Sequence, residues 1–263
     1  MYTRTRSSSV PSAPSRSPRS TPVAAKKKAG PEPSLWERME RPAAPRAALT
    51  PQRIVDVAVE LADAEGFAAV TMRRIATELG VAPMAAYRHV SGKDDLLALM
   101  VDRVSGELDV PEDVTGWREV LRAYAVRSRV MTLAHPWMTQ LPASLFMLTP
   151  TRMAVAERQL ASLDGLGLDP DTMMAAFRAV TSYVHGATQS QVALDRFRAE
   201  QGWDSGDETR RALAPQMNYL LDSGRYPVYR SYAYSATRKD DPTWEFEFGL
   251  DCVLDGIARR LGL

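Results

Sequence analysis

The sequence predicts an all-α fold, and three features of the chain support this prediction. Apolar residues recur every three or four positions through most of residues 50–263, which is the spacing of an amphipathic helix. Threonine, aspartate and proline residues stand where several of these segments begin, as is typical of helix starts. No segment sustains the strict alternation of apolar and polar residues that marks a β-strand.

Length and composition favour a soluble globular protein with one large domain or two modest ones. The chain has 263 residues, of which 45% are hydrophobic and 25% are charged. No apolar run approaches the roughly 20 residues that a membrane-spanning helix needs, so we expect no membrane partner. The single cysteine, Cys252, excludes an internal disulfide and permits a reducing compartment, and we expect a cytoplasmic location.

Residues 1–48 form a basic arm whose composition differs from that of the rest of the chain. They hold ten Lys and Arg against three Glu, a net charge of +7, which leaves −6 on the other residues. Because the arm is rich in Ser, Pro and Arg and poor in large apolar residues, we expect it to be disordered. It indicates either an anionic partner, such as nucleic acid or a membrane surface, or a solvated tail. An organelle transit peptide has a similar composition, but the scattered prolines argue against it.

Two helices are predicted directly after the arm. In LTPQRIVDVAVELADAEG, Thr50 is a good N-cap, Pro51 fits the first helical position, and Gly66 can end the helix. In VTMRRIATELG, Thr71 caps a second helix and Gly80 supplies a left-handed turn at its end.

A very short helix and a longer one follow. Pro83 starts the helix PMAAYRHV, and Ser91 and Asp94 have capping-box spacing for the helix in KDDLLALMVDRVSGEL. Two short helices joined by a tight turn that contains glycine form a helix-turn-helix, which can be a DNA-reading edge or only a corner.

The charge pattern favours the DNA-reading edge. Between positions 71 and 93 there are four basic residues and one acidic residue, a net charge of +3, whereas residues 49–108 together carry six basic and nine acidic residues, a net charge of −3. Positive charge that is concentrated at the turn is what phosphate contacts need. The basic residues are Arg73, Arg74, Arg88 and Lys93, and the acidic residue is Glu78.

The segment VTMRRIATELGVAPMAAYRHVSGKDDLLALMVD resembles the DNA-binding domain of the tetracycline-repressor family of bacterial transcriptional regulators. The resemblance lies in the TxRxIAxxLGV run, the YxHxxxKxxL run and the long helix that follows. It implies an N-terminal three-helix helix-turn-helix DNA-binding domain, which we place at residues 49–108. A C-terminal helical ligand-binding and dimerisation domain would then occupy residues 109–263.

The resemblance also implies roles for individual residues. Tyr87 and His89 match positions used against the DNA backbone and the groove edge, and Lys93 matches a phosphate-contacting lysine. Arg73 matches a position from which some members reach a base, where an arginine can donate two bonds to guanine. The candidate DNA-binding set is Thr71, Arg73, Arg74, Pro83, Met84, Ala85, Tyr87, His89 and Lys93.

Each of these roles has a plainer alternative. Tyr87 could be packed in the core, His89 could be a structural hydrogen-bonding residue, and Arg74 could be a solvated surface charge. Met84 and Ala85 can touch a thymine methyl but cannot donate hydrogen bonds, so base specificity would rest on few contacts. The basic arm could lie along DNA or enter its minor groove, or it could be an inert tail.

Helical patterns resume after residue 116. One helix should end near Ala134-His135-Pro136, two proline-bounded pieces follow, and another helix covers residues 152–163. A long helix should run from Pro170 to about Arg198, followed by an acidic loop, AEQGWDSGDETR, that we expect to be mobile. The first of these helices is marked by Trp117, Val120, Leu121, Tyr124 and Val130.

Two apolar seams suggest a homodimer built on a four-helix interface. A two-fold dimer would place two recognition helices about 34–36 Å apart, over a palindromic site. Packing of both seams within one chain is the alternative. The first seam comprises Met173, Phe177, Val180, Val184, Ala187, Gln191 and Leu194, and the second comprises Phe246, Leu250, Val253, Leu254, Ile257 and Leu261. The second seam lies in FEFGLDCVLDGIARRL, which resembles the last helix of the family, through which members dimerise. The candidate dimerisation residues are Phe177, Val184, Gln191, Leu250, Leu254, Ile257 and Leu261.

The resemblance further implies a pocket for a small-molecule effector in the second domain. Candidates are polar, aromatic or methionine residues near helix breaks, with core packing as the alternative for each. They are His135, Trp137, Met138, Gln140, Phe146, Met147, Tyr183, His185 and Gln189. His135 falls where tetracycline-binding members place a histidine that ligates the drug-bound magnesium, but no tetracycline-specific set surrounds it here. We predict no metal site and no cofactor.

An enzyme is the main alternative class of protein. The chain has three histidines and one cysteine, and it contains no Gly-rich phosphate loop, HExxH, GxSxG or metal-spaced Cys/His cluster. An all-α scaffold would leave the local charge of +3 unexplained. The sequence therefore predicts a ligand-responsive DNA-binding transcriptional regulator. We expect a repressor that binds a palindromic operator as a homodimer and is released by a small molecule.

Overall fold

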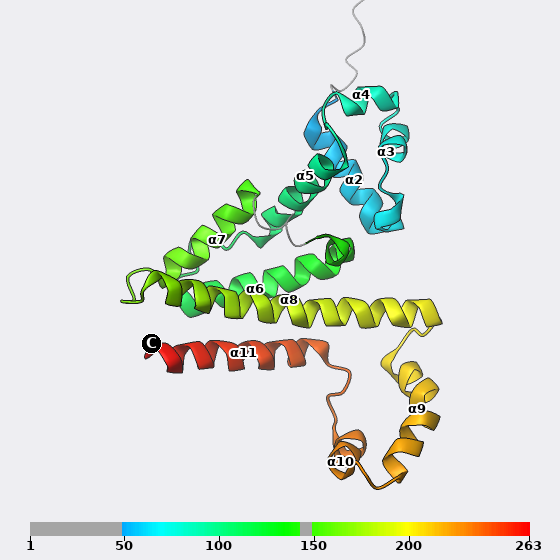
Figure 1. Ribbon diagram of the computed structural model, residues 1–263, viewed down its shortest axis with the longest axis vertical. Helices are drawn as coiled ribbons and strands as arrows, with labels where there is room; N and C mark the ends of the chain where they lie inside the picture. The colour runs from blue at the N-terminus through cyan, green and yellow to red at the C-terminus, as the bar shows by residue number, and fades with distance from the viewer. Residues whose placement is uncertain (1–48, 143–148) are drawn as a thin grey trace, which may run out of the picture. The chain divides into compact units, whose positions relative to one another are not determined.

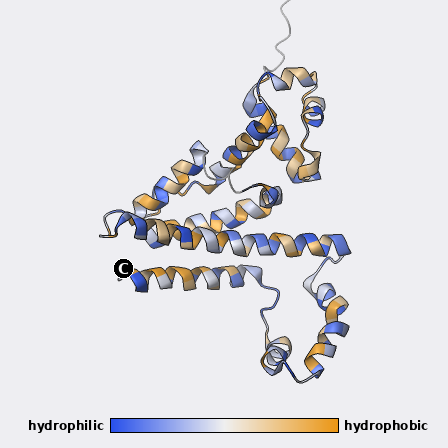
Figure 2. Cartoon of the chain, viewed as in Figure 1, coloured by the Kyte–Doolittle hydropathy of each residue, from blue (hydrophilic) through white to orange (hydrophobic). Residues whose placement is uncertain are grey.

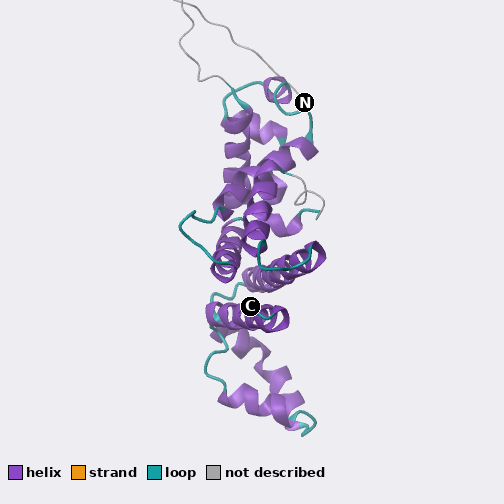
Figure 3. Cartoon of the chain, turned by 90° about the vertical axis from the view of Figure 1, so that its left-hand side faces the viewer, coloured by secondary structure: helices purple, strands orange, loops and turns teal. Residues whose placement is uncertain are grey.

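The computed structural model describes residues 49–142 and 149–263, and this part of the chain contains helices and loops but no strand (Figures 1 and 3). The prediction of an all-α fold is therefore confirmed. The basic arm and two ligand candidates, Phe146 and Met147, lie outside the described residues. No described helix combines the length and apolar character that a membrane span requires. The helices are α2 (Pro51–Glu65), α3 (Met72–Glu78), α4 (Pro83–Tyr87), α5 (Lys93–Ser105), α6 (Trp117–Ala134), α7 (Pro150–Leu163), α8 (Pro170–Gln201), α9 (Gly206–Asp222), α10 (Pro227–Ser235) and α11 (Pro242–Leu261), with 3-10 turns η1 (Phe67–Ala69), η2 (Gly106–Leu108) and η3 (Pro136–Gln140).

The helix-turn-helix forms as the caps predict. The Thr50 hydroxyl accepts a hydrogen bond from the Arg53 amide at 3.2 Å, and the Thr71 hydroxyl accepts one from the Arg74 amide at 3.2 Å. Gly80 has φ of 65°, the left-handed conformation that lets the chain turn sharply after α3.

The start of α5 differs from the prediction. Its N-cap is Gly92, which offers no side-chain cap, so the proposed capping box of Ser91 and Asp94 is not formed. Asp94 and Asp95 instead lie in the first turn, where their charges complement the helix dipole.

A first apolar core holds the helix-turn-helix together and continues beyond it. Ile54 of α2, Ile75 of α3 and Met100 of α5 are fully buried in this core, and Met131 of α6 and Trp137 of η3 belong to the same cluster. Residues 49–263 accordingly form one compact unit. The division into domains at residue 108 stays a prediction.

A second apolar core lies between α6, α8 and α11, which contact one another (Figure 1). It contains most of the second predicted seam and part of the first. Val184, Leu250, Leu254 and Ile257, which the sequence suggested as dimer contacts, are at most 8% exposed within the single chain. For these residues the alternative of packing within one chain is correct. Phe177, Gln191 and Leu261 are partly buried, and the Gln191 side chain accepts a hydrogen bond from Arg129 at 2.9 Å.

The first predicted seam is wrong at its end, because Leu194 is 42% exposed. Val130, which was predicted to mark the apolar face of the helix now seen as α6, is 58% exposed and does not face the core either. Beyond Val184 the buried positions of α8 are Thr188 and Val192, which continue the i, i+4 row, whereas the prediction turned toward Gln191 and Leu194.

The helices α8 and α11 approach closely at Tyr183 and Gly249. The Tyr183 hydroxyl donates a hydrogen bond to the Phe246 carbonyl at 2.7 Å, and a Cβ at position 249 would lie 2.7 Å from Cζ of the tyrosine ring. Tyr183 therefore links two helices, which is a structural role and not the ligand contact predicted from the sequence.

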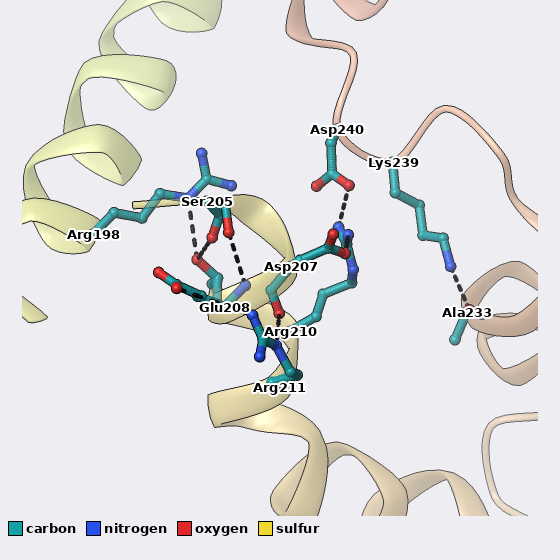
Figure 4. A network of polar contacts seen from close by, with 10 residues as sticks. Arg198, Ser205, Asp207, Glu208, Arg210, Arg211, Ala233, Lys239 and Asp240 are labelled. Carbon is teal, nitrogen blue, oxygen red and sulfur yellow. Dashed lines mark hydrogen bonds and ion pairs between the residues drawn. The ribbon is translucent and has the colours of Figure 1, made fainter. Parts of the chain in front are cut away.

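The predicted acidic loop, residues 199–210, is helical at both ends: residues 199–201 finish α8, residues 206–210 begin α9, and residues 202–205 connect the two helices. Ser205 caps α9, and its hydroxyl accepts a hydrogen bond from the Glu208 amide at 3.2 Å. Arg210 forms ion pairs with Asp207 and Asp240, and Lys239 donates to the Ala233 carbonyl at the end of α10 (Figure 4). These polar contacts join the start of α9 and the end of α10 to residues 239–240, which precede α11. No element was predicted between residue 210 and the second seam.

Candidate nucleic-acid interface and ligand cavity

Helix α4 presents an apolar, exposed face. Met84 is 69% exposed and Tyr87 is 46% exposed, whereas Ala86 points into the core and is fully buried. Ala85 is half-buried, and hydrophobic residues occupy the middle of this short helix (Figure 2). The exposure of Tyr87 rules out its alternative role as a core residue.

The exposed basic charge around the turn is carried by Arg73, Arg88 and Lys93. Arg73 forms no ion pair with any residue in the described part of the chain. Arg74 is different, because its guanidinium pairs with Glu65 at 2.8 Å and with Glu78 at 2.6 Å. The hydrogen bond to Glu65 and the charges of both carboxylates raise the Arg74 pKa. Its charge is thus already compensated within the protein, which argues against the predicted DNA contact.

Lys93 stands at the first position of α5, where it is exposed. Its ammonium lies 5.2 Å from the centre of the Phe67 ring, a cation–π contact that holds the long side chain near η1. Because Asp94 and Asp95 follow it in the first turn, the positive end of the helix dipole is partly offset there. The attraction for a phosphate at this point would rest mainly on the lysine.

His89 follows α4, in the connection that leads to Lys93. Its side chain is exposed, and its amide bonds to the Ala86 carbonyl at 3.0 Å. Thr71 and Pro83 are exposed at the N-termini of α3 and α4. All nine predicted DNA-binding residues are therefore exposed or partly exposed on or next to α3, α4 and the start of α5. The charge of Arg74 is already paired with Glu65 and Glu78.

A cavity of about 460 Å³ lies between α6, α7, α8 and η3. Its wall combines methionines with many hydroxyl groups, and it includes one arginine and one histidine. Three of the predicted ligand residues, Met138, His185 and Gln189, line it. The complete described lining is Tyr124, Ser128, Met131, Thr132, Met138, Thr139, Arg152, Thr181, Ser182, Val184, His185, Thr188 and Gln189.

Two lining residues give the cavity its polar character. The guanidinium of Arg152 lies 3.4 Å from the Ser105 hydroxyl, and desolvation lowers the pKa of this arginine. Thr188 is 1% exposed, and its hydroxyl oxygen makes no hydrogen bond within the described residues. Sequence reasoning missed both, because arginine and threonine are mostly exposed residue types and nothing in the sequence shows that these two face inward.

Three other predicted ligand residues lie elsewhere. Trp137 and Gln140 line a separate hollow of about 390 Å³ between α2, η3 and α8, and the Trp137 indole donates to Asp63 at 2.7 Å. His135 is 8% exposed and lies between two carboxylates, with Nδ1 2.8 Å from Asp63 and Nε2 3.0 Å from Glu107. Although burial opposes the charged imidazolium, the hydrogen bonds and charges of the two carboxylates raise the His135 pKa. His135 is therefore a structural link, as its alternative interpretation held.

The cavity shares residues with the first apolar core. Tyr124, Met131 and Met138 line the cavity and also belong to the cluster that contains the buried residues of α2 and α5. A molecule that displaces these three side chains would also displace the buried residues of α2 and α5, because tightly packed interiors transmit strain.

Two family models match the chain. The model for bacterial regulatory proteins of the tetR family matches residues 54–100, and the model for the tetracyclin repressor-like C-terminal domain matches residues 110–261. The first match contains the helix-turn-helix, and the second contains the cavity.

The chain is also similar to transcriptional repressors and to solved structures of TetR family proteins. The HTH-type transcriptional repressor DrrR1 of Streptomyces coeruleorubidus is 37% identical over 235 residues, which cover 87% of this chain and 86% of the relative. The tetracycline repressor protein class A of Escherichia coli is 26% identical over 215 residues, with coverages of 81% and 92%. A crystal structure of the Streptomyces coelicolor TetR family protein ActR in complex with actinorhodin is 29% identical, with a TM-score of 0.65 and coverages of 80% and 96%.

Proposed function

Because this chain belongs to the tetracycline-repressor family of bacterial transcriptional regulators, we propose that its α3–α4 surface reads operator DNA and that a small molecule in the cavity controls this binding. The observation that carries the proposal is the continuity of one apolar core from the cavity wall to the helix-turn-helix. The relatives are regulators, and the chain is assigned to that class and not to the enzymes.

For DNA binding, we assign phosphate contacts to Lys93, Tyr87 and His89. Lys93 is exposed and held in position by Phe67, and Tyr87 offers a hydroxyl on an exposed ring. Arg73, exposed and without an ion pair among the described residues, is the candidate for direct base contact. Met84 would supply apolar contact to a thymine methyl.

On the regulatory side, the protein acts as a repressor that the ligand releases. The ligand-free form holds the two helix-turn-helix units of a dimer at the spacing of an operator. The ligand favours a second form with a different spacing, and it can do so only to the extent that it binds that form more tightly.

A dimer requires an interface other than the buried seam residues. Outward-facing apolar side chains on α8 and α11 are candidates: Leu194 and Phe197 are each 42% exposed, and Phe248 is 58% exposed. Trp244 stacks on Phe248 with ring centres 5.5 Å apart, which gives this surface a large apolar element. A two-fold dimer through these faces would read a palindromic operator.

Selection of bound duplexes from a random pool tests the proposed function. The full-length, ligand-free protein should enrich one inverted repeat, with half-sites related by two-fold symmetry. Enrichment of a single half-site would contradict the dimer, and the absence of any enriched sequence would contradict the proposed function itself.

A further inference from the structure

The charge of the cavity wall restricts the ligands that it can take. Arg152 is a cation at the wall, and the described lining contains no Asp or Glu. A cationic ligand would therefore meet a like charge and no counter-charge. An anionic group would meet the guanidinium in a poorly solvated place, where opposite charges attract more strongly than in water.

A second observation points to an oxygen-bearing ligand. The hydroxyl of Thr188 is buried and has no hydrogen-bond partner within the described residues. Buried polar groups are nearly always hydrogen-bonded, so such an exception needs an explanation. The same wall carries Ser128, Thr132 and Thr181, but the hydroxyls of Thr132 and Thr181 already donate to the backbone carbonyls of Ser128 and Arg178 and can only accept from a ligand.

The rest of the wall is apolar and suits a ring system. Met131, Met138 and Val184 line the cavity, and methionine side chains adapt to flat or irregular ligands. A volume of about 460 Å³ lies within the usual range of small-molecule pockets.

We propose that the cavity binds a carboxylic acid on an apolar ring system, with the carboxylate on Arg152 and a further oxygen or the same carboxylate on Thr188. This inference rests on the proposed role of the cavity as the effector site. An arginine and a carboxylate form a charge-assisted pair that a neutral amide of the same shape cannot reproduce.

Calorimetric titration of the full-length, DNA-free protein with matched acid and amide pairs tests the proposal. The probes are benzoate and benzamide, 2-naphthoate and 2-naphthamide, and anthraquinone-2-carboxylate and its amide. For at least one pair the acid should bind about tenfold more tightly than the amide, as expected for a hydrogen bond to a charged group. Thr188→Val should weaken binding of that acid several-fold.

Variants locate the effect. Arg152→Gln should bring the acid-to-amide ratio close to one and leave amide binding nearly unchanged, with circular dichroism as a check that the variant is folded. Arg178→Gln removes the same charge from an exposed position on α8 outside the cavity wall and should keep the ratio of the native protein.

Two results would overturn the proposal. One is that no acid binds the native protein more tightly than its amide, and the other is that the preference persists in Arg152→Gln. Neither result affects the duplex selection, which uses ligand-free protein. Conversely, failure of the duplex selection would leave the titrations interpretable, so the two proposals fail separately.

Discussion

His135 links the helix-turn-helix to the body through two carboxylates, Asp63 and Glu107. A neutral imidazole has one N–H and can donate to one of them, whereas the imidazolium donates to both. The sequence placed His135 beside a proline at a helix end but could not identify its partners, which are 72 and 28 residues away. Arg74 shows the same limit, since its exposure can be guessed but its pairing with Glu65 cannot.

The raised pKa of His135 predicts a pH dependence of stability. Because the folded-state pKa lies above the unfolded value, the stabilisation is fully present below the unfolded pKa, about 6.5, and is lost as the pH rises through the folded pKa. Urea unfolding at several pH values should give a higher free energy of unfolding for the native protein than for His135→Gln. This difference should be smaller at high pH than at low pH. A pH-independent difference for His135→Gln would be inconsistent with the two-carboxylate link.

Thr188 makes a second prediction for a single residue. Thr188→Val keeps the side-chain shape and removes a buried hydroxyl that lacks a partner, so it should raise the free energy of unfolding of the ligand-free protein by about 1 kcal/mol. Thr181→Val is the control, because that hydroxyl bonds to the Arg178 carbonyl at 3.2 Å and its loss should not stabilise. A destabilised Thr188→Val would mean that the hydroxyl has a partner.

Among the helices, three with recognisable caps were predicted well, whereas α9 was missed although the Ser205 side chain caps it. Thr50, Thr71 and Asp169 each cap a predicted helix through the side chain. The first five residues of α9 were assigned to an acidic loop because glycines and charges dominate the start of this helix, and Pro215 interrupts the pattern of the remainder, which was left unassigned. Ser205 and Glu208 have the S-x-x-E spacing of a capping box, a signal that could have identified it.

The packing of α8 against α11 depends on a glycine. Gly249→Ala would bring a methyl group into the Tyr183 ring, which is fixed by its bond to Phe246, and should lower the free energy of unfolding by about 1–3 kcal/mol. Gly256→Ala on the same helix has nothing within 4 Å and should be neutral or stabilising by up to about 1 kcal/mol. Chemical denaturation of the two variants compares them directly, and equal effects would argue against the close approach.

For the whole molecule, the sequence predicted the helical class and the helix-turn-helix but mistook part of the inner core for an interface. An apolar stripe at helical spacing shows that one face of the helix is buried. It does not show whether that face packs against the same chain or against a second copy. Leu250 and Leu254 are covered by α6 and α8 of their own chain.

The proposed interface on α8 and α11 makes a prediction about assembly. Phe248→Glu places a charge on an outward-facing apolar position and should shift the protein from dimer to monomer in light scattering, because burying an unpaired charge is costly. Glu247→Gln, at a neighbouring exposed position, should leave the assembly unchanged. A Phe248→Glu protein that remains dimeric would place the interface elsewhere.

The α3–α4 surface, together with Lys93 at the start of α5, is proposed to contact operator DNA, and the salt dependence of binding tests this contact most directly. Fluorescence anisotropy of the selected duplex, titrated at several salt concentrations, gives the affinity and its salt slope for the native protein and for Lys93→Ala. We expect Lys93→Ala to bind all sequences more weakly than the native protein does. The slope of log affinity against log salt concentration should be smaller by about one. An affinity and a slope equal to those of the native protein would contradict the claim.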